Sequence, residues 1–96
     1  MKYIVQIELD PVTGLEVEAN PQSLQAMLGQ WQALKPLALY ANLDRRAITV
    51  IVDAPNEDPL FEALHTTWRV TKSYPRVSPV VSMEEFPQLL HRAGVM

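Results

Sequence analysis

Residues 37–53 decide the fold, and they read LALYANLDRRAITVIVD. Apolar residues recur at every second position on both sides of a polar interruption at 44–46, which is the period of β-strands. The stretch 48–52 is also rich in β-branched residues, which favour strands. The pattern therefore predicts a β-hairpin with strands over 37–43 and 48–52.

The register of this hairpin follows from its loop. A loop centred on 44–45 pairs Leu39 with Val50. The next pair along the strands is Tyr40 with Thr49. This register places the apolar residues of both strands on one face, whereas a slip by one residue would move one strand's apolar residues to the other face. We therefore expect this register.

The residues before the hairpin predict one strand and one helix. Residues 2–10 alternate in the manner of a strand whose two faces differ in polarity. The stretch 11–19 begins with turn residues and has no clear period, so we expect a loop there. Asn20 precedes Pro21 as a capping residue precedes the first helical position, and apolar residues follow at helical spacing. This arrangement predicts a helix over 21–34.

The residues after the hairpin predict a helix, a strand and a short final helix. The arrangement of a capping residue followed by a proline recurs at the start of a helix expected over 58–69. The strand expected over 76–81 contains Pro79, which a sheet tolerates only at an edge or a bulge, so this strand should be an edge strand. A short helix over 86–92 should end at Gly94.

The predicted element order is β-α-β-β-α-β with a terminal helix, in a single domain over residues 1–96. It is the order of a ferredoxin-like α+β fold, in which a four-stranded antiparallel sheet of order 4-1-3-2 carries both main helices on one face. Trp31 and Trp68 fall on apolar stripes of these helices, so we expect both in the core. The sheet residues expected under the helices are Tyr3, Val5, Ile7, Leu9, Leu37, Leu39, Leu43, Ile48, Val50, Val52, Val77 and Val81.

Composition excludes several classes of protein. The chain of 96 residues has no cysteine, which excludes disulfides, thiolate metal sites and cysteine nucleophiles. A net charge of −3 opposes the basic surface that nucleic-acid binding needs. No apolar run approaches the roughly 20 residues of a membrane span. We therefore expect a cytoplasmic protein with neither nucleic acid nor a membrane as its partner.

The second face of the sheet is expected to be covered by another molecule. It combines polar residues with more apolar area than a face in contact with water normally has. Two copies that pack these faces together would form a symmetric homodimer with a partly polar interior. The residues of this face are Ile4, Gln6, Glu8, Ala38, Tyr40, Asn42, Ala47, Thr49, Ile51, Arg76, Ser78 and Val80.

Four runs in the second half of the chain resemble the dimeric α+β barrel superfamily, in particular muconolactone isomerase-like proteins and small relatives that end in a V-x-P-V strand. The runs are 41–42, 48–54, 60–64 and 74–81. The resemblance implies a dimer whose two sheets face each other, which is sometimes assembled further, and often a cavity without a cofactor. It carries over no catalytic residue, because residues 36–40 read PLALY where muconolactone isomerases have a polar motif.

Two charged residues of the second face are candidates for chemistry. If the first and last strands are antiparallel neighbours, Glu8 and Arg76 should lie close together. In a functional interpretation Arg76 binds an anionic group of a ligand and Glu8 acts as a base. Gln6, Tyr40 and Asn42 then supply hydrogen bonds from the wall. The alternative is a salt bridge, within the sheet or across the dimer, that fixes the register.

The two histidines are further candidates. His65 lies beside the apolar stripe of the helix expected over 58–69, where it would act as a general base at the mouth of a cavity. His91 lies in the terminal helix. Neither has a second histidine or a carboxylate at ligand spacing, so we expect no metal and no cofactor. The alternative for both histidines is a partly exposed helix residue without a chemical role.

Two functions from different classes fit these residues. The first is a dimeric module for association or for binding a small molecule, and the absence of a nucleophile–base constellation supports it. The second is a cofactor-independent isomerase or lactone-directed enzyme that transfers a proton on a small anionic organic molecule. Glu8 or His65 would be its base and Arg76 its anchor. Its main support is analogy of fold, which does not by itself imply function.

Overall fold

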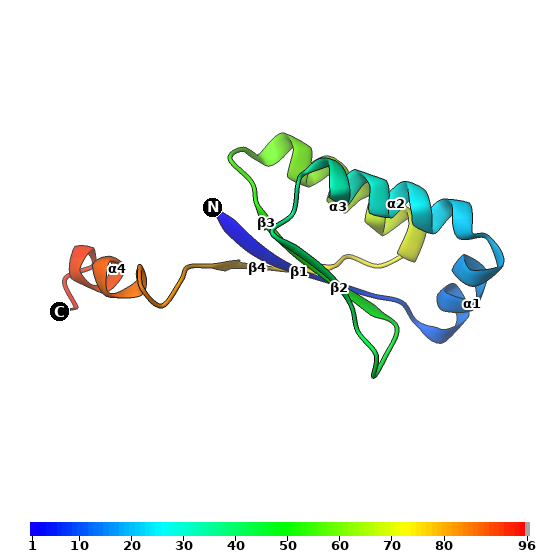
Figure 1. The fold of residues 1–96 in the computed structure, drawn as a ribbon, viewed down its shortest axis with the longest axis horizontal. Helices are drawn as coiled ribbons and strands as arrows, with labels where there is room; N and C mark the ends of the chain where they lie inside the picture. The colour runs from blue at the N-terminus through cyan, green and yellow to red at the C-terminus, as the bar shows by residue number, and fades with distance from the viewer. Residues whose placement is uncertain (96) are drawn as a thin grey trace.

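A computed structural model describes residues 1–95 and shows an α+β fold with a four-stranded antiparallel sheet and four helices (Figure 1). The elements are β1 (Lys2–Glu8), α1 (Pro11–Ala19), α2 (Pro21–Ala33), β2 (Ala38–Ala41), β3 (Ala47–Asp53), α3 (Glu57–Thr71), β4 (Arg76–Val80) and α4 (Phe86–Arg92). The strand order is β2-β3-β1-β4, which is 4-1-3-2 when read from the β4 edge. The predicted edge position of the strand that contains Pro79 is therefore confirmed.

The register of the sheet settles which residues share a face. The hairpin pairs Leu39 with Val50, as predicted. β1 lies between β3 and β4 and is antiparallel to both, so Val5 is opposite Val50 on one side and opposite Val77 on the other. Because side chains alternate along a strand, these residues point to the same face of the sheet.

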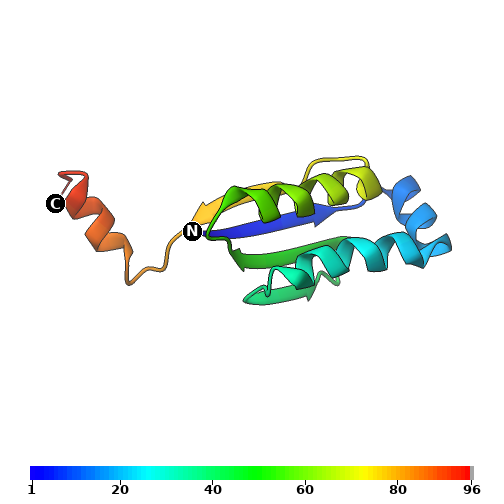
Figure 2. The same cartoon turned by 90° about the horizontal axis from the view of Figure 1, so that it is seen from above.

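α2 and α3 cover that face, and the core lies between them and the sheet (Figures 1 and 2). Trp31 of α2 is fully buried, and its Nε1 donates a hydrogen bond to Oγ1 of Thr67 on α3 at 2.7 Å. The Thr67 hydroxyl in turn donates to the carbonyl of Ala63 at 2.8 Å. The other large buried side chains of the core are Val5, Ile7, Met27, Val50 and Val52.

Four predictions of burial are wrong. Leu37, Leu43 and Val81 are exposed instead of lying under the helices, and Leu43 is completely exposed. All three lie beyond the ends of β2 or β4, so the alternation of the sheet no longer directs them. Trp68 is 39% exposed because it lies on the outer side of α3 instead of in the core.

Residues 11–19 form the helix α1, where the sequence predicted a loop. Asp10 caps this helix, since its carboxylate accepts hydrogen bonds from the Thr13 amide at 2.8 Å and from the Thr13 hydroxyl at 3.0 Å. Leu15, its largest apolar side chain, is exposed. Small or polar residues dominate the buried side, which is why no apolar period marks the helix. The buried residues are Thr13, Gly14 and Val17.

α4 projects away from the rest of the molecule (Figures 1 and 2). Its observed range is the one predicted, and Gly94 follows it with a φ of 76°. None of its residues is buried. The molecule is consequently elongated, with a longest dimension of 53 Å.

Candidate functional site

The face of the sheet opposite α2 and α3 carries most of the predicted site residues, and we call it the open face. Neither α2 nor α3 contacts it, because both lie on the other side of the sheet (Figure 1). The strand pairing places the following residues on it: Lys2, Ile4, Gln6, Glu8, Ala38, Tyr40, Ala47, Thr49, Ile51, Asp53, Arg76, Ser78 and Val80.

One row of the open face is largely apolar. Ile51 on β3 is opposite Ala38 on one side and opposite Ile4 on the other. Ile4 is in turn opposite Ser78 on β4, so the row crosses all four strands. The three apolar members are half-buried by their neighbours within the sheet. We call Ala38, Ile51, Ile4 and Ser78 the apolar row.

The adjacent row is polar and also crosses all four strands. Tyr40 is opposite Thr49, Thr49 is opposite Gln6, and Gln6 is opposite Arg76. These four residues form the polar row. Three of them, Gln6, Tyr40 and Arg76, are residues that the sequence proposed as ligand contacts, and the sheet brings them into one line.

Thr49 is the centre of this row, and the sequence did not single it out. Its Oγ1 lies 3.1 Å from Oε1 of Gln6 and 3.1 Å from Oδ1 of Asn42. A hydroxyl has one proton, so Thr49 donates to one of these oxygens at a time, and its contacts connect Gln6 with Asn42. The signal in the sequence was its position opposite Tyr40 in the predicted hairpin.

Glu8 does not form the expected pair with Arg76. β4 begins at Arg76, which is opposite Gln6, so Glu8 extends beyond the end of that strand. Its carboxylate instead lies 3.3 Å from the guanidinium of Arg45 in the hairpin loop. Both side chains are more than half exposed, and such an ion pair contributes little to stability.

His65 lies on a different surface, within a row of neighbouring aromatic rings on the outer side of α3. Its ring centroid is 6.0 Å from that of Phe61 and 5.7 Å from that of Trp68. Trp68 stacks in turn on Tyr74 at 5.6 Å. Since α3 covers the face opposite the one that carries Glu8, these two candidate bases cannot act on the same substrate.

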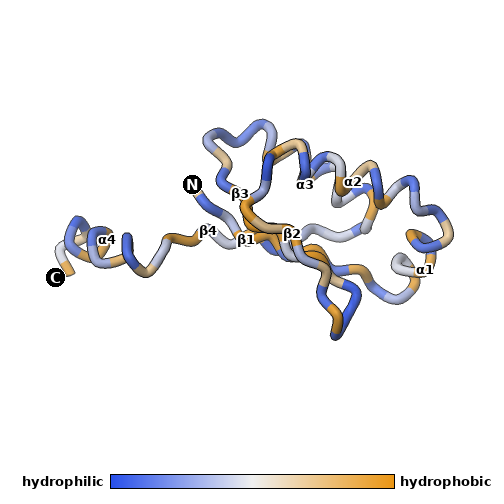
Figure 3. The backbone as a smooth tube through the Cα atoms, in the orientation of Figure 1, coloured by the Kyte–Doolittle hydropathy of each residue, from blue (hydrophilic) through white to orange (hydrophobic). Residues whose placement is uncertain are grey.

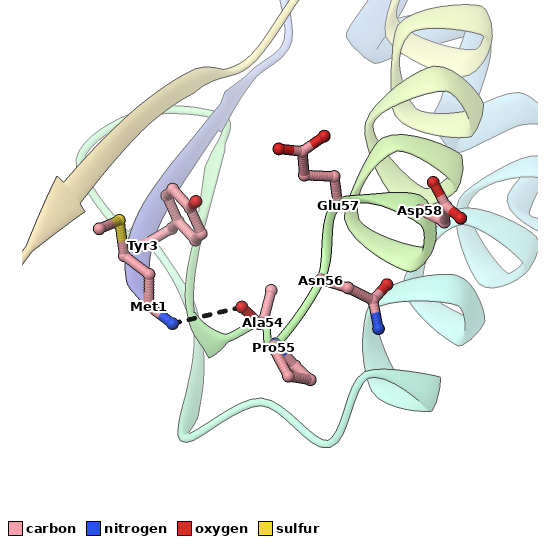
Figure 4. Close-up of a pocket in the computed structure, with 7 residues that line it drawn as sticks. All are labelled: Met1, Tyr3, Ala54, Pro55, Asn56, Glu57 and Asp58. Carbon is pink, nitrogen blue, oxygen red and sulfur yellow. Dashed lines mark hydrogen bonds between the residues drawn. The ribbon is translucent and has the colours of Figure 1, made fainter.

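A separate open hollow of about 520 Å³ lies where β1 and α3 begin (Figure 4). It is formed by Met1, Tyr3 and residues 54–58. The Met1 amine donates a hydrogen bond to the carbonyl of Ala54 at 3.3 Å. The acidic side chains of this hollow point in different directions (Figure 4), and none of the predicted site residues lines it. It therefore brings no set of catalytic groups together.

The chain thus belongs to the class of α+β proteins with helices on one face of an open sheet. No protein-family model matches it, and neither a curated protein nor a solved structure gives a significant match. Within residues 1–95, no three His, Asp or Glu side chains converge as ligands for a metal ion. No helix in this part of the chain has the length and apolarity needed to cross a bilayer. The open face is the surface where most of the candidate site residues meet.

Proposed function

We propose that this protein is a homodimeric binding module in which the open faces of two copies pack together, on the plan of a ferredoxin-like dimeric α+β barrel. The observation that carries the proposal is the apolar row beside the polar row on a face that no helix covers. The polar row then lies between the two sheets, where it can hold a small anionic molecule.

The apolar row supports the dimer. Ile4 and Ile51 are opposite one another near the centre of the sheet, and both remain partly exposed. Full burial of an exposed aliphatic side chain contributes about 1.5–3 kcal/mol, and completing the burial of a partly exposed one contributes a fraction of that. In a two-fold dimer the same surface of both copies takes part, so each residue contributes twice to the free energy of dimerisation. A second copy is thus the simplest partner that matches this surface.

The polar row supports an anionic ligand. Arg76 is exposed and forms no ion pair with any residue in the part of the chain that the structure describes. Burial of a guanidinium without a counter-charge is costly, so a dimer that encloses Arg76 favours an anion beside it. Gln6 and Tyr40 are positioned in the same row to donate hydrogen bonds to that molecule.

The proton-transfer alternative has less support. Glu8 is exposed and paired with Arg45, so nothing desolvates it as a general base requires. His65 lies on α3, on the opposite side of the sheet from the face that carries Arg76. A base and an anionic anchor therefore do not meet within one copy.

The test of the dimer is a charge placed on the open face without removing a core residue. Ser78→Arg does this, because Ser78 is exposed at the end of the apolar row. We expect wild-type protein to sediment as a dimer and Ser78→Arg as a monomer with an unchanged circular dichroism spectrum. The matched control is Ser73→Arg in the exposed connection before β4, which should remain dimeric. A monomeric wild-type protein, or a Ser78→Arg protein that dimerises as well as wild type, would contradict the proposal.

The ligand is tested separately by nuclear magnetic resonance titration with benzoate, citrate and inorganic phosphate. We expect at least one of these anions to shift the amide signals of Gln6 and Thr49. Arg76→Gln should weaken that binding by about tenfold or more, since a charge-assisted hydrogen bond is lost. Arg69→Gln on the exposed side of α3 is the control and should bind as wild type does. Equal binding by both variants would exclude Arg76 as the anchor.

A further inference from the structure

Residues 81–95, which we call the arm, extend away from the rest of the molecule and pack little against it. They leave the end of β4 without turning back over the sheet or the helices (Figures 1 and 2). The arm meets its own body, residues 1–80, only at the end of the strands. There Glu85 and Leu89 face Lys2 across an open hollow of about 320 Å³. The arm is therefore not packed as the other helices are.

The arm nevertheless has the apolar spacing of a helix that packs against another surface. Phe86, Leu89 and Leu90 recur at the spacing that forms one face of a helix. Phe86 is 42% exposed, and Met83 just before the helix is 80% exposed. In Figure 3 a short hydrophobic stretch at the end of β4 is followed by mixed hydrophilic and hydrophobic colours through the arm, and no other element lies against it. No other element within residues 1–95 buries this apolar helix face.

A helix of this length does not persist without such a partner. α4 has seven residues, and isolated helices shorter than about 12–15 residues are marginal in water. Its first turn contains Pro87, and Gly94 follows it in a left-handed conformation, so both ends are well defined. Local signals define where the helix begins and ends, and packing must supply its stability.

The chain exposes more surface than a compact monomer of its mass, and the excess is as large as the area that a dimer buries on each copy. A compact monomer of this mass exposes about 5,600 Å². This chain exposes 6848 Å², an excess of about 1,200 Å². Its radius of gyration is 15.5 Å, against about 12.5 Å for a compact domain of this length. A stable dimer buries about 800 Å² on each partner, so the excess is sufficient for one.

We propose that the arm is exchanged between two copies of this chain, so that the apolar face of α4 packs on the body of the second copy at the margin of its open face. The inference rests on the proposed dimer and adds the second element that holds it together. The arm leaves its own body beside Lys2 and Val80, which lie at the end of the open face. In a two-fold dimer of open faces, this margin of one copy meets the other copy.

The direct test uses a mixture of two isotopic forms of the full chain. Copies labelled with ¹³C are mixed with unlabelled copies, and only nuclear Overhauser effects between different copies are recorded. We expect effects from the Leu89 and Leu90 methyl groups of one copy to body residues of the other. A dimer with effects between open faces but none from α4 would overturn the arm exchange and leave the proposed dimer intact. A monomer would overturn both.

A matched pair of variants gives the energetic test. Leu89→Asp places a charge in the apolar face of α4, and Leu15→Asp makes the same change at a residue of α1 that is 64% exposed. Because α4 buries no residue in its own chain, Leu89→Asp should leave the circular dichroism of the body unchanged. We expect it to weaken dimerisation by about tenfold or more in sedimentation equilibrium. Leu15→Asp should dimerise as wild type does, and equal dimerisation by both variants would overturn the exchange.

Discussion

At the scale of single residues, the hydroxyl group of Thr67 joins the two helices that cover the sheet. It accepts a hydrogen bond from Trp31 at 2.7 Å and donates one to Ala63 at 2.8 Å, and both Thr67 and Trp31 are fully buried. Thr67→Val keeps the shape of the side chain but leaves the Trp31 Nε1 without an acceptor. We expect the free energy of unfolding to fall by about 1–3 kcal/mol, measured by chemical denaturation.

Thr67→Ser is the control for this prediction. Serine retains the hydroxyl and loses one methyl group, which costs about 0.8 kcal/mol. The serine variant should therefore be more stable than the valine variant. If the valine variant were the more stable of the two, packing of the methyl group and not the hydrogen bond would dominate at this position.

Some features of the candidate site could be predicted from the sequence, and others could not. The alternation along each strand predicted that Gln6, Tyr40 and Arg76 share a face, and the pairing of β1 with β3 and β4 in the structure adds that they lie in one row. The ion-pair partner of Glu8 could not be predicted from the sequence. It depends on the register between β1 and β4, which the sequence did not determine: Arg76 is opposite Gln6, two residues before Glu8, and Glu8 pairs with Arg45.

At the scale of elements, helices were predictable where apolar residues mark the buried side. α2 and α3 bury a stripe of apolar residues and begin after a polar residue and near a proline, and their observed ranges are close to those expected. α1 buries Thr13, Gly14 and Val17 instead, so its period was hidden. Its one readable signal was the acidic residue Asp10 before Pro11, which is the same capping arrangement that marked α2.

Because Asp10 caps α1, the stability of this helix depends on pH. The hydrogen bonds from the Thr13 amide and hydroxyl hold the pKa of Asp10 below its ordinary value of 3.8. Since the pKa is lower in the folded state, the stabilisation is present above 3.8 and is lost as the pH falls through the folded-state pKa. We expect Asp10→Ala to lower the thermal unfolding midpoint at neutral pH and the difference from wild type to shrink in strong acid.

Asp10→Asn separates the cap from the charge. Asparagine caps helices about as well as aspartate but does not titrate. Its unfolding midpoint should therefore stay near that of wild type at neutral pH, and its difference from Asp10→Ala should not shrink in acid. An Asp10→Ala protein with the wild-type midpoint at neutral pH would show that α1 is held by packing alone.

At the scale of the whole molecule, two surfaces have no partner among the residues that the structure describes. One is the open face with its apolar row, and the other is the apolar side of α4. Both arise from the same feature of the topology, because β4 is an edge strand that continues outward instead of returning over the sheet. A second copy related by a two-fold axis covers both surfaces at once, whereas a partner with a different shape would have to match them separately.

A dimer of this kind makes folding depend on protein concentration. Association stabilises the folded state by mass action, and a tenfold rise in concentration adds about 1.4 kcal/mol for each dimer. For two chains of this length, this corresponds to a rise in the unfolding midpoint of about 3–5 °C per tenfold, measurable by calorimetry. Ser78→Arg, which is expected to be monomeric, should show a constant midpoint. A constant midpoint for wild type over a hundredfold range would mean that the body is stable alone, and the exposed area of the arm would then need a different partner.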